Sequence, residues 1–143
     1  MPKVSQNDTT SLWEGLTRAH QAMTAALEKD MLPEAGMPLA WFEVLRHLMR
    51  AEGGLMRFQD LAKVAGITES GASRRLDQMI KAGLIERQTC PTDRRGAFAH
   101  ITGSGVAAYE RGNAVFMRSL KSNLSGLNQA EVRALRTALE RFS

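Results

Sequence analysis

The chain has 143 residues, 43% of them hydrophobic and 24% charged, with one cysteine, which fits one globular domain and excludes an internal disulfide. No segment approaches the roughly 18 apolar residues of a membrane span. MPKVSQNDTT also lacks the apolar stretch of a signal peptide, so we expect a cytoplasmic protein without a membrane partner. The net charge of +4 is uneven: residues 1–36 hold three basic and five acidic residues, and the rest hold 16 and 10, which favours a polyanionic partner.

Two helices are predicted in the first third of the chain. Residues 1–10 are polar and expected to fray, and Ser11 and Glu14 form a capping box that predicts a helix start at Ser11. Segment 32–36 should break this helix, and Pro38 should open the second. Each carries an apolar stripe: Leu12, Leu16, Ala19, Met23 and Ala26 on the first, and Trp41, Val44, Leu45 and Leu48 on the second.

Short elements follow in the middle of the chain. Residues 55–57 suffice only for a minor strand, 58–64 form a brief helix, and 69–82 form another helix, which Gly83 stops. Residues 84–89 are then predicted as a strand, 91–96 as a turn and 97–101 as the returning strand. Helix 69–82 has an apolar face of Ala72, Leu76, Met79 and Ile80, opposite a polar face of Ser70, Ser73, Arg74 and Asp77.

Two further helices complete the chain. Thr102 caps a long helix with Val106, Tyr109, Phe116, Leu120 and Leu124 on its apolar side. Asn128 to Glu131 caps the last helix, and Leu127 and Val132 are placed as a hydrophobic staple. The last stripe consists of Val132, Leu135, Leu139 and Phe142.

Two short helices followed by a hairpin are typical of a winged helix-turn-helix, which predicts DNA binding. A helix fits the major groove, where Ser70, Ser73 and Arg74 near its start reach bases and phosphates, and Gly71 lets the backbone approach closely. The alternative is that these polar side chains only solvate an exposed face.

The hairpin tip, DRRG, holds two adjacent arginines. Arginine at a turn can enter the narrow minor groove, where the negative potential is strongest. Asp93 would repel phosphate, and it is explained as a brace that pairs with Arg95 and orients it. The alternative is an ordinary turn with solvated charges.

At this point the sequence resembles the MarR family of bacterial and archaeal transcriptional regulators. The matching pattern is Asp93, Arg95, Ala99, Ile101, Thr102 and Gly105, and SRRLDQMIKAGLIER (73–87) resembles the family's recognition helix. The resemblance implies a mainly α (α+β) fold, with 37–102 as a winged helix-turn-helix DNA-binding lobe. Segments 11–36 and 103–143 would be the dimerisation helices of a single domain spanning 1–143.

The resemblance also implies a homodimer that binds a pseudo-palindromic operator through recognition helix 69–82 and wing 89–97. Arg95 would be the family's wing-tip arginine, and Arg94 an extra phosphate contact. The chain departs from the family pattern at Arg75, which contacts DNA or lies at the rim of the core, and at Gln78. The predicted DNA-binding set is Ser70, Gly71, Ser73, Arg74, Arg75, Gln78, Asp93, Arg94 and Arg95.

Other chemistry finds less support. No clustered catalytic pair is visible, so an enzyme is not expected, nor is a cofactor. Glu43 and His47 are one helical turn apart and suit either a metal or, preferably, an i,i+4 ion pair. Cys90 is either a redox switch, its pKa lowered by Arg87 and the wing arginines, or an unremarkable wing cysteine.

The family's usual switch is a small-molecule pocket. His20, Met23, Trp41 and His47 are on the elements that would line it and suit a small aromatic or phenolic ligand, although such residues are more often core. We therefore expect a ligand-released repressor, with an activator as the less frequent alternative. The alternatives are a winged helix used as a protein-interaction module, or a redox- or metal-sensing regulator.

Overall fold

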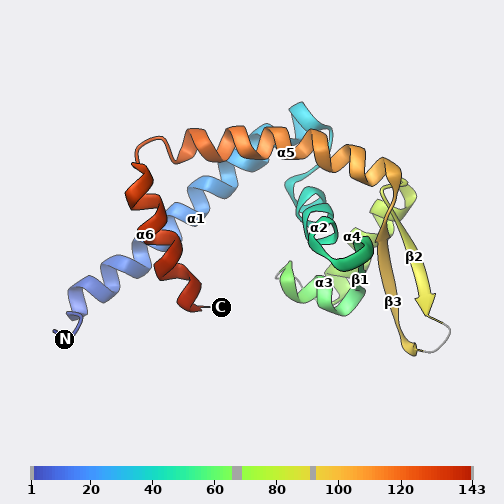
Figure 1. Ribbon diagram of the computed structural model, residues 1–143, viewed down its shortest axis with the longest axis horizontal. Coiled ribbons are helices and arrows are strands. Elements are labelled where there is room, and N and C mark those ends of the chain that lie inside the picture. Colours follow the sequence, from blue (N-terminus) through green and yellow to red (C-terminus); the bar gives the residue numbers. More distant parts are fainter. Residues whose placement is uncertain (1, 66–68, 91–92, 143) are drawn as a thin grey trace. The chain divides into compact units, whose positions relative to one another are not determined.

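The computed structural model describes residues 2–65, 69–90 and 93–142, and at Glu69, Cys90 and residues 93–95 it describes the backbone alone. Its helices are α1 (Gln6–Ala35), α2 (Leu39–Arg50), α3 (Phe58–Val64), α4 (Glu69–Lys81), α5 (Gly103–Asn123) and α6 (Gln129–Leu139). The strands are β1 (Leu55–Arg57), β2 (Ile85–Cys90) and β3 (Asp93–Ile101), and short 3-10 turns cover Glu52–Gly54 and Glu140–Phe142. These helices and strands are labelled in Figure 1.

The chain forms two compact units. One, the central unit, is Glu28–Val115, and the other, the terminal unit, combines the chain up to Leu27 with the chain from Phe116 onward. Helices α1 and α5 contribute to both units. The described residues contain no helix that is both long and apolar enough to cross a bilayer.

The first helix is longer than its predicted bounds. It begins at Gln6, not Ser11, because Ser5 caps it: the Asp8 amide donates to Ser5 Oγ at 3.0 Å, and Ser5 Oγ donates to the Asp8 carboxylate at 2.6 Å. The prediction that residues 1–10 fray is therefore wrong for 6–10. Pro33 lies inside the helix, where it removes one backbone bond near the C-terminus, and Gly36, with φ 75°, ends it.

The core of the central unit is built on α2. Phe42, Val44, Leu45 and Leu48 are buried, whereas Trp41 from the predicted stripe is half-buried. Phe42 stacks on Tyr109 of α5 with ring centroids 5.7 Å apart. A Cβ on Gly112 would lie 2.5 Å from the Phe42 ring, so α5 can approach α2 this closely only because position 112 has no side chain.

The buried face of α5 differs from the predicted one. Val106, Tyr109, Phe116, Leu120 and Leu124 are half-buried. The deepest positions carry mostly small residues instead: Gly105, Ala108, Gly112, Val115 and Ser119. Thr102 caps the helix as predicted, because its Oγ1 accepts from the Gly105 amide at 3.0 Å.

The three strands form an antiparallel sheet in the order β1-β3-β2, and the β2–β3 hairpin extends beyond the helices in Figure 1. Leu55 pairs with His100, Thr89 pairs with Ala97, and Cys90 pairs with Asp93 after a register shift. The predicted turn at 91–96 is therefore too long, because β3 begins at Asp93 rather than Ala97. Strand β3 runs through Gly96 despite the local turn signal of that residue, and the register shift between Thr89 and Cys90 lies opposite residues 94–96; positions 91 and 92 lie outside the described residues.

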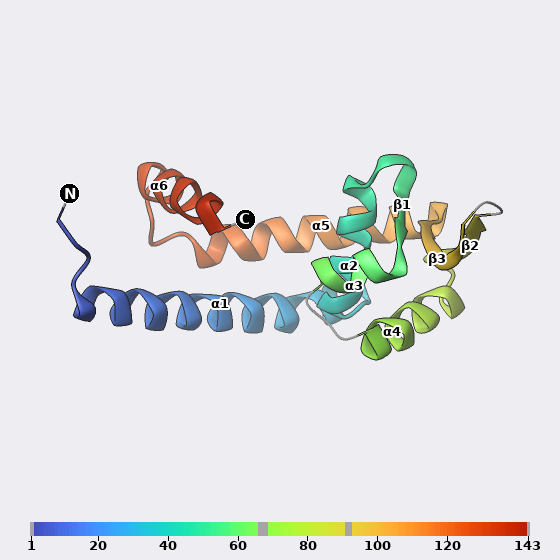
Figure 2. The same cartoon turned by 90° about the horizontal axis from the view of Figure 1, so that it is seen from below.

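Helices α3 and α4 lie side by side and lead into β2 (Figure 2). Both match their predicted ranges to within one residue, although the intervening 66–68 are outside the described residues. Leu61 and Ala62 of α3 and Ala72, Leu76 and Met79 of α4 are buried against the sheet and α2.

The predicted cap of α6 is confirmed, because the Glu131 amide donates to Asn128 Oδ1 at 2.8 Å and the Asn128 amide donates to Glu131 Oε1 at 3.0 Å.

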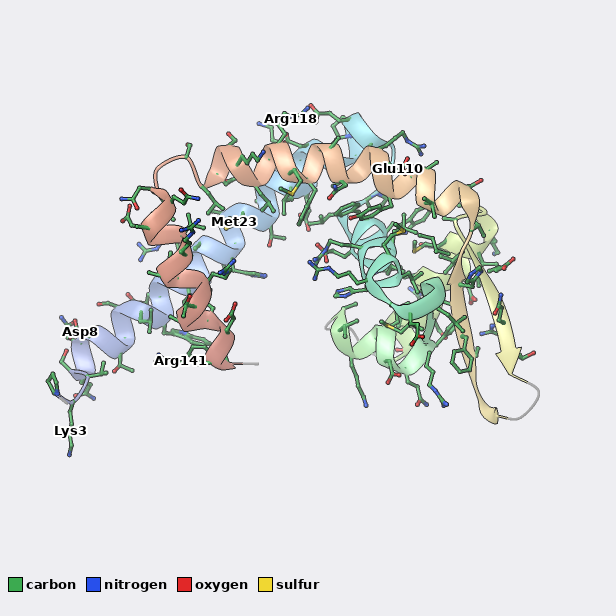
Figure 3. All side chains as sticks on the ribbon, viewed as in Figure 1. Lys3, Asp8, Met23, Glu110, Arg118 and Arg141 are labelled. Carbon is green, nitrogen blue, oxygen red and sulfur yellow. The ribbon has the colours of Figure 1, made fainter. Side chains whose placement is uncertain are left out.

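The terminal unit contains a groove of about 770 Å³ between α1 and α6. Met23, labelled in Figure 3, lines the groove from α1. The predicted stripes supply most of its apolar lining: Leu12, Leu16, Ala19, Met23, Val132, Leu135 and Leu139.

Candidate nucleic-acid interface

Helix α4 has one buried face and one exposed face. Ala72, Leu76 and Met79 are buried at 4% exposure or less, which fixes the rotation of the helix about its axis. The predicted residues Ser70, Gly71, Ser73, Arg74 and Gln78 are exposed on the other side. They can therefore contact a duplex without unfolding the helix.

Arg75 is half-buried and lies at the rim of the core. A position at the rim of the core is one of the two interpretations that the sequence allowed for Arg75. Since a long side chain can bury its methylene stem and still present its guanidinium outward, contact with DNA stays a prediction.

The predicted wing-tip residues are the first three of β3. The backbone of Asp93 pairs with Cys90 across the hairpin, and Arg94 and Arg95 follow on the same strand. The side chains of Cys90, Asp93, Arg94 and Arg95 lie outside the described residues, so the bracing of Arg95 by Asp93 and the redox role of Cys90 stay predictions.

Closer to the helices, the wing sheet carries a polar cluster. His100 Nδ1 lies 3.0 Å from Glu86 Oε1, and the Gln88 amide donates to the same oxygen at 3.3 Å. The hydrogen bond with His100, followed by that from Gln88, lowers the pKa of Glu86 below its ordinary value. Pairing of β2 with β3 brings these side chains onto one face.

Two arginine–phenylalanine pairs form another feature, which the sequence did not reveal. The guanidinium of Arg57 lies over Phe98 at 5.1 Å from the ring centroid, and that of Arg87 lies over Phe58 at 5.0 Å. Both arginines are exposed. One signal in the sequence could have indicated these pairs. Arg57 is followed directly by Phe58, and the two predicted hairpin strands carry Arg87 and Phe98.

The Glu43 and His47 pair is mainly engaged in ionic contacts. Arg46 donates to Glu43 Oε2 through Nη2 at 2.8 Å and Nε at 3.2 Å, and His47 Nε2 lies 3.9 Å from the same oxygen. Burial lowers the pKa of His47, Arg46 and Arg50 add to this, and Glu43 partly opposes it. The close ion pair of Glu43 is therefore with Arg46, and the predicted pair with His47 is ionic only when the imidazole is protonated. No cluster of three or more metal-ligating side chains occurs among the described residues.

The predicted ligand-pocket residues belong to two units. His20 and Met23 are in the terminal unit, where Met23 lines the groove and His20 is exposed. Trp41 and His47 are half-buried in the central unit. Their joint role in a ligand pocket stays a prediction.

Helices α3 and α4, followed by the antiparallel β2–β3 hairpin, define the central unit as a winged helix-turn-helix. Within it, residues 35–96 match the model of the MarR family.

The fold of almost the whole chain is similar to that of solved MarR family structures. The DNA complex of Sco3205, a MarR family regulator from Streptomyces coelicolor, is 24% identical, with 99% of this chain and 89% of that chain covered and a TM-score of 0.84. AbsC, another regulator of this family from S. coelicolor, is 26% identical over 99% and 95% of the two chains, with a TM-score of 0.83. Bordetella bronchiseptica BpsR, whose DNA binding is regulated by 6-hydroxynicotinic acid, is 24% identical over 92% and 98%, with a TM-score of 0.79.

The resemblance to the MarR family is thereby confirmed: residues 35–96 match the family's model, and the fold matches solved MarR family regulators over nearly the whole chain. Its fold is that of the winged-helix MarR family regulators. Of these proteins, Sco3205 was solved with DNA, and the DNA binding of BpsR is regulated by 6-hydroxynicotinic acid.

Proposed function

We propose that two copies of this chain form a cytoplasmic dimer that represses transcription from a pseudo-palindromic operator and is released by a small aromatic or phenolic ligand. Helix α4 reads the major groove through Ser70, Gly71, Ser73, Arg74 and Gln78, with Arg75 at its edge. The start of β3 enters the minor groove with Arg95, while Arg94 contacts a phosphate and Asp93 orients Arg95.

The observation that carries this proposal is the division of α4 into two faces. Its apolar residues are buried in the core, and its serines, Arg74 and Gln78 are left on the surface. A rigidly seated helix of this kind has the width of the major groove. The wing strand that carries Arg94 and Arg95 pairs directly with the strand leaving α4, which supports a joint grip on one duplex.

The second copy is proposed to cover the α1–α6 groove of the terminal unit. Of the residues that line the groove, Leu12 is 56% exposed, Leu135 46% and Leu139 45%, and α6 has no buried residue. A soluble monomer rarely leaves such a contiguous apolar surface in water. A twofold dimer formed there would present two α4 helices to half-sites about 34 Å apart, one turn of B-DNA.

A ligand would act by changing that spacing. His20, Met23, Trp41 and His47 are the proposed contacts, with the imidazoles as polar anchors for the ligand. A ligand that binds better to a dimer with misplaced recognition helices shifts the population away from the DNA-bound form. Regulation of the relative BpsR by 6-hydroxynicotinic acid supports an aromatic acid as the ligand class.

The test is a fluorescence-anisotropy titration of the protein on the DNA upstream of its own coding sequence, at several salt concentrations. The affinity should fall steeply as salt rises, because phosphate contacts release counterions. An affinity that is flat in salt, or absent, would instead favour the alternative of a protein-interaction module. Arg111→Ala, an exposed arginine of α5 outside the proposed interface, is the matched control for Arg74→Ala.

A further inference from the structure

A small basic pocket lies beside α3 and the wing strands. It has a volume of about 210 Å³ and is lined by Arg57, Phe58, Gln59, Arg87, Gly96 and Ala97. These residues come from β1, α3, β2 and β3.

The chemistry of the lining favours an anion. Its side-chain polar groups are two guanidinium groups and one amide, and none of its six residues is acidic. Each guanidinium lies over a phenyl ring, Arg57 over Phe98 and Arg87 over Phe58. Such a contact restricts the arginine side chain, so less conformational entropy is lost when an anion binds.

The position of the pocket identifies the anion. Phe58 and Gln59 also line a second hollow of about 130 Å³, together with Ala62, Ala72 and Ser73. The first turn of α3 therefore separates Ser73 of the recognition helix from Gly96 and Ala97 of the wing. In a duplex, the major groove and the adjacent minor groove are separated by one sugar–phosphate strand, which must run past this turn when α4 occupies one groove and the wing the other.

We propose that Arg57 and Arg87 bind a phosphodiester of the DNA strand that lies between the two grooves, with the Gln59 amide donating to the same strand. This inference rests on the proposed function, since it requires α4 and the wing to occupy neighbouring grooves. The pocket then sets the register of the protein on the duplex and carries no base preference of its own.

The test compares Arg57→Gln, Arg87→Gln and the double variant with Arg111→Gln as the matched control. Two labelled duplexes are used: one selected by the parent protein from a randomised pool, and one of random sequence. Each single variant should bind both duplexes several-fold more weakly, and the slope of log affinity against log salt should become shallower by roughly one per lost contact. Arg111→Gln should keep the slope of the parent protein.

An ethylation-interference experiment on the parent protein needs no variant and guards against a folding defect. Ethylation of a phosphate between the bases protected in the major groove and those protected in the minor groove should block binding to the selected duplex. In the double variant, interference at that phosphate should disappear while the base protections persist.

Two outcomes separate this inference from the proposed function. If the parent protein binds with steep salt dependence but shows no interference at an intervening phosphate, or the double variant keeps the parent slope, the pocket does not hold a phosphodiester and the proposed function stands. If the parent protein binds neither duplex in a salt-dependent manner, both proposals fail. Arg87→Lys, which keeps the charge but loses the planar group, should retain the slope and lose only part of the affinity.

Discussion

The central and terminal units treat their apolar residues in opposite ways. Of the buried side chains among the described residues, all but Leu27 and Ser119 lie in the central unit, where Phe42, Leu45 and Met79 are fully covered. In the terminal unit, Trp13 is 71% exposed and Phe142 79%. Similar helical stripes therefore lead to a core in one unit and to a surface in the other.

The difference shows that apolar periodicity alone does not indicate what a helix packs against. The stripe of α2 is covered within the chain by α5, α3 and the sheet, whereas α6 has no buried residue. Because burial of apolar surface is the main stabilising contribution to folding and association, the exposed apolar surface of the terminal unit is the basis of the proposed dimer. The central unit is explained by its own packing.

The largest effect is expected from charging the groove of the terminal unit. Leu135 lines this groove and is 46% exposed. Leu135→Asp should therefore change the stability of the single folded chain little and destabilise a dimer strongly. We expect sedimentation equilibrium to show a dimer for the parent protein and a monomer for the variant. Affinity for a two-half-site duplex should drop roughly a hundredfold or more, because the two lobes then bind independently.

Ala134→Asp places the same charge on the exposed side of α6, outside the groove lining, and should remain dimeric. A parent protein that sediments as a monomer, or a Leu135→Asp variant that still dimerises, would show that the terminal unit is not the dimer interface.

The polar surface of the central unit is tested next. Arg74→Ala should lower operator affinity by about 1–3 kcal/mol and relax the preference at particular bases if the contact is bidentate to guanine.

Arg95→Ala should weaken binding to all sequences while leaving the fold intact. Anisotropy titrations against a panel of single-base operator variants measure both effects, and operator binding by Arg95→Ala as tight as that of the parent would refute the wing assignment.

Another prediction concerns whether the core of the central unit tolerates extra volume. Gly112→Ala places a Cβ where Phe42 and Met37 atoms lie 2.5 and 2.9 Å away, so it should lower the free energy of unfolding by about 1–3 kcal/mol. Gly103→Ala, in the same helix with nothing within 4 Å of its Cβ position, should change it by less than about 0.5 kcal/mol. Urea denaturation of the two variants measures the contrast, and equal stability would mean that α5 shifts away from α2 at little cost.

The sequence predicted those features of both units that depend on local chemistry. The cap at Asn128 and Glu131 was recognised because both partners lie within four residues and the motif has few alternatives. Ser11 and Glu14 form an equally good motif, but Ser5 and Asp8 lie upstream and cap the helix earlier. A local pattern therefore identified the helix without determining where it begins.

Tertiary contacts account for most of what was missed. The buried face of α5 is marked by small residues such as Ala108 and Gly112, which an apolar period does not single out because their role is to allow close approach. The pocket residues Arg57 and Arg87 are 30 positions apart and meet only through strand pairing. The exposed face of α4 was predictable, since one helix alone determines it.

The smallest expected effect concerns pH and the half-buried His47 of the central unit. Burial, together with Arg46 and Arg50, holds the pKa of His47 below its ordinary value of 6.5, with Glu43 opposing in part. Just below pH 6.5, His47 therefore binds more protons in the unfolded chain than in the folded chain. Its contribution to the free energy of unfolding should be fully present above that pH and should be lost as the pH falls through it. In urea denaturation between pH 5 and 8, His47→Gln should reduce this slope, with the exposed His20→Gln as the matched control. A variant slope as steep as that of the parent protein would mean that other groups cause the loss, and that the Glu43–Arg46–His47 cluster contributes nothing to acid sensitivity.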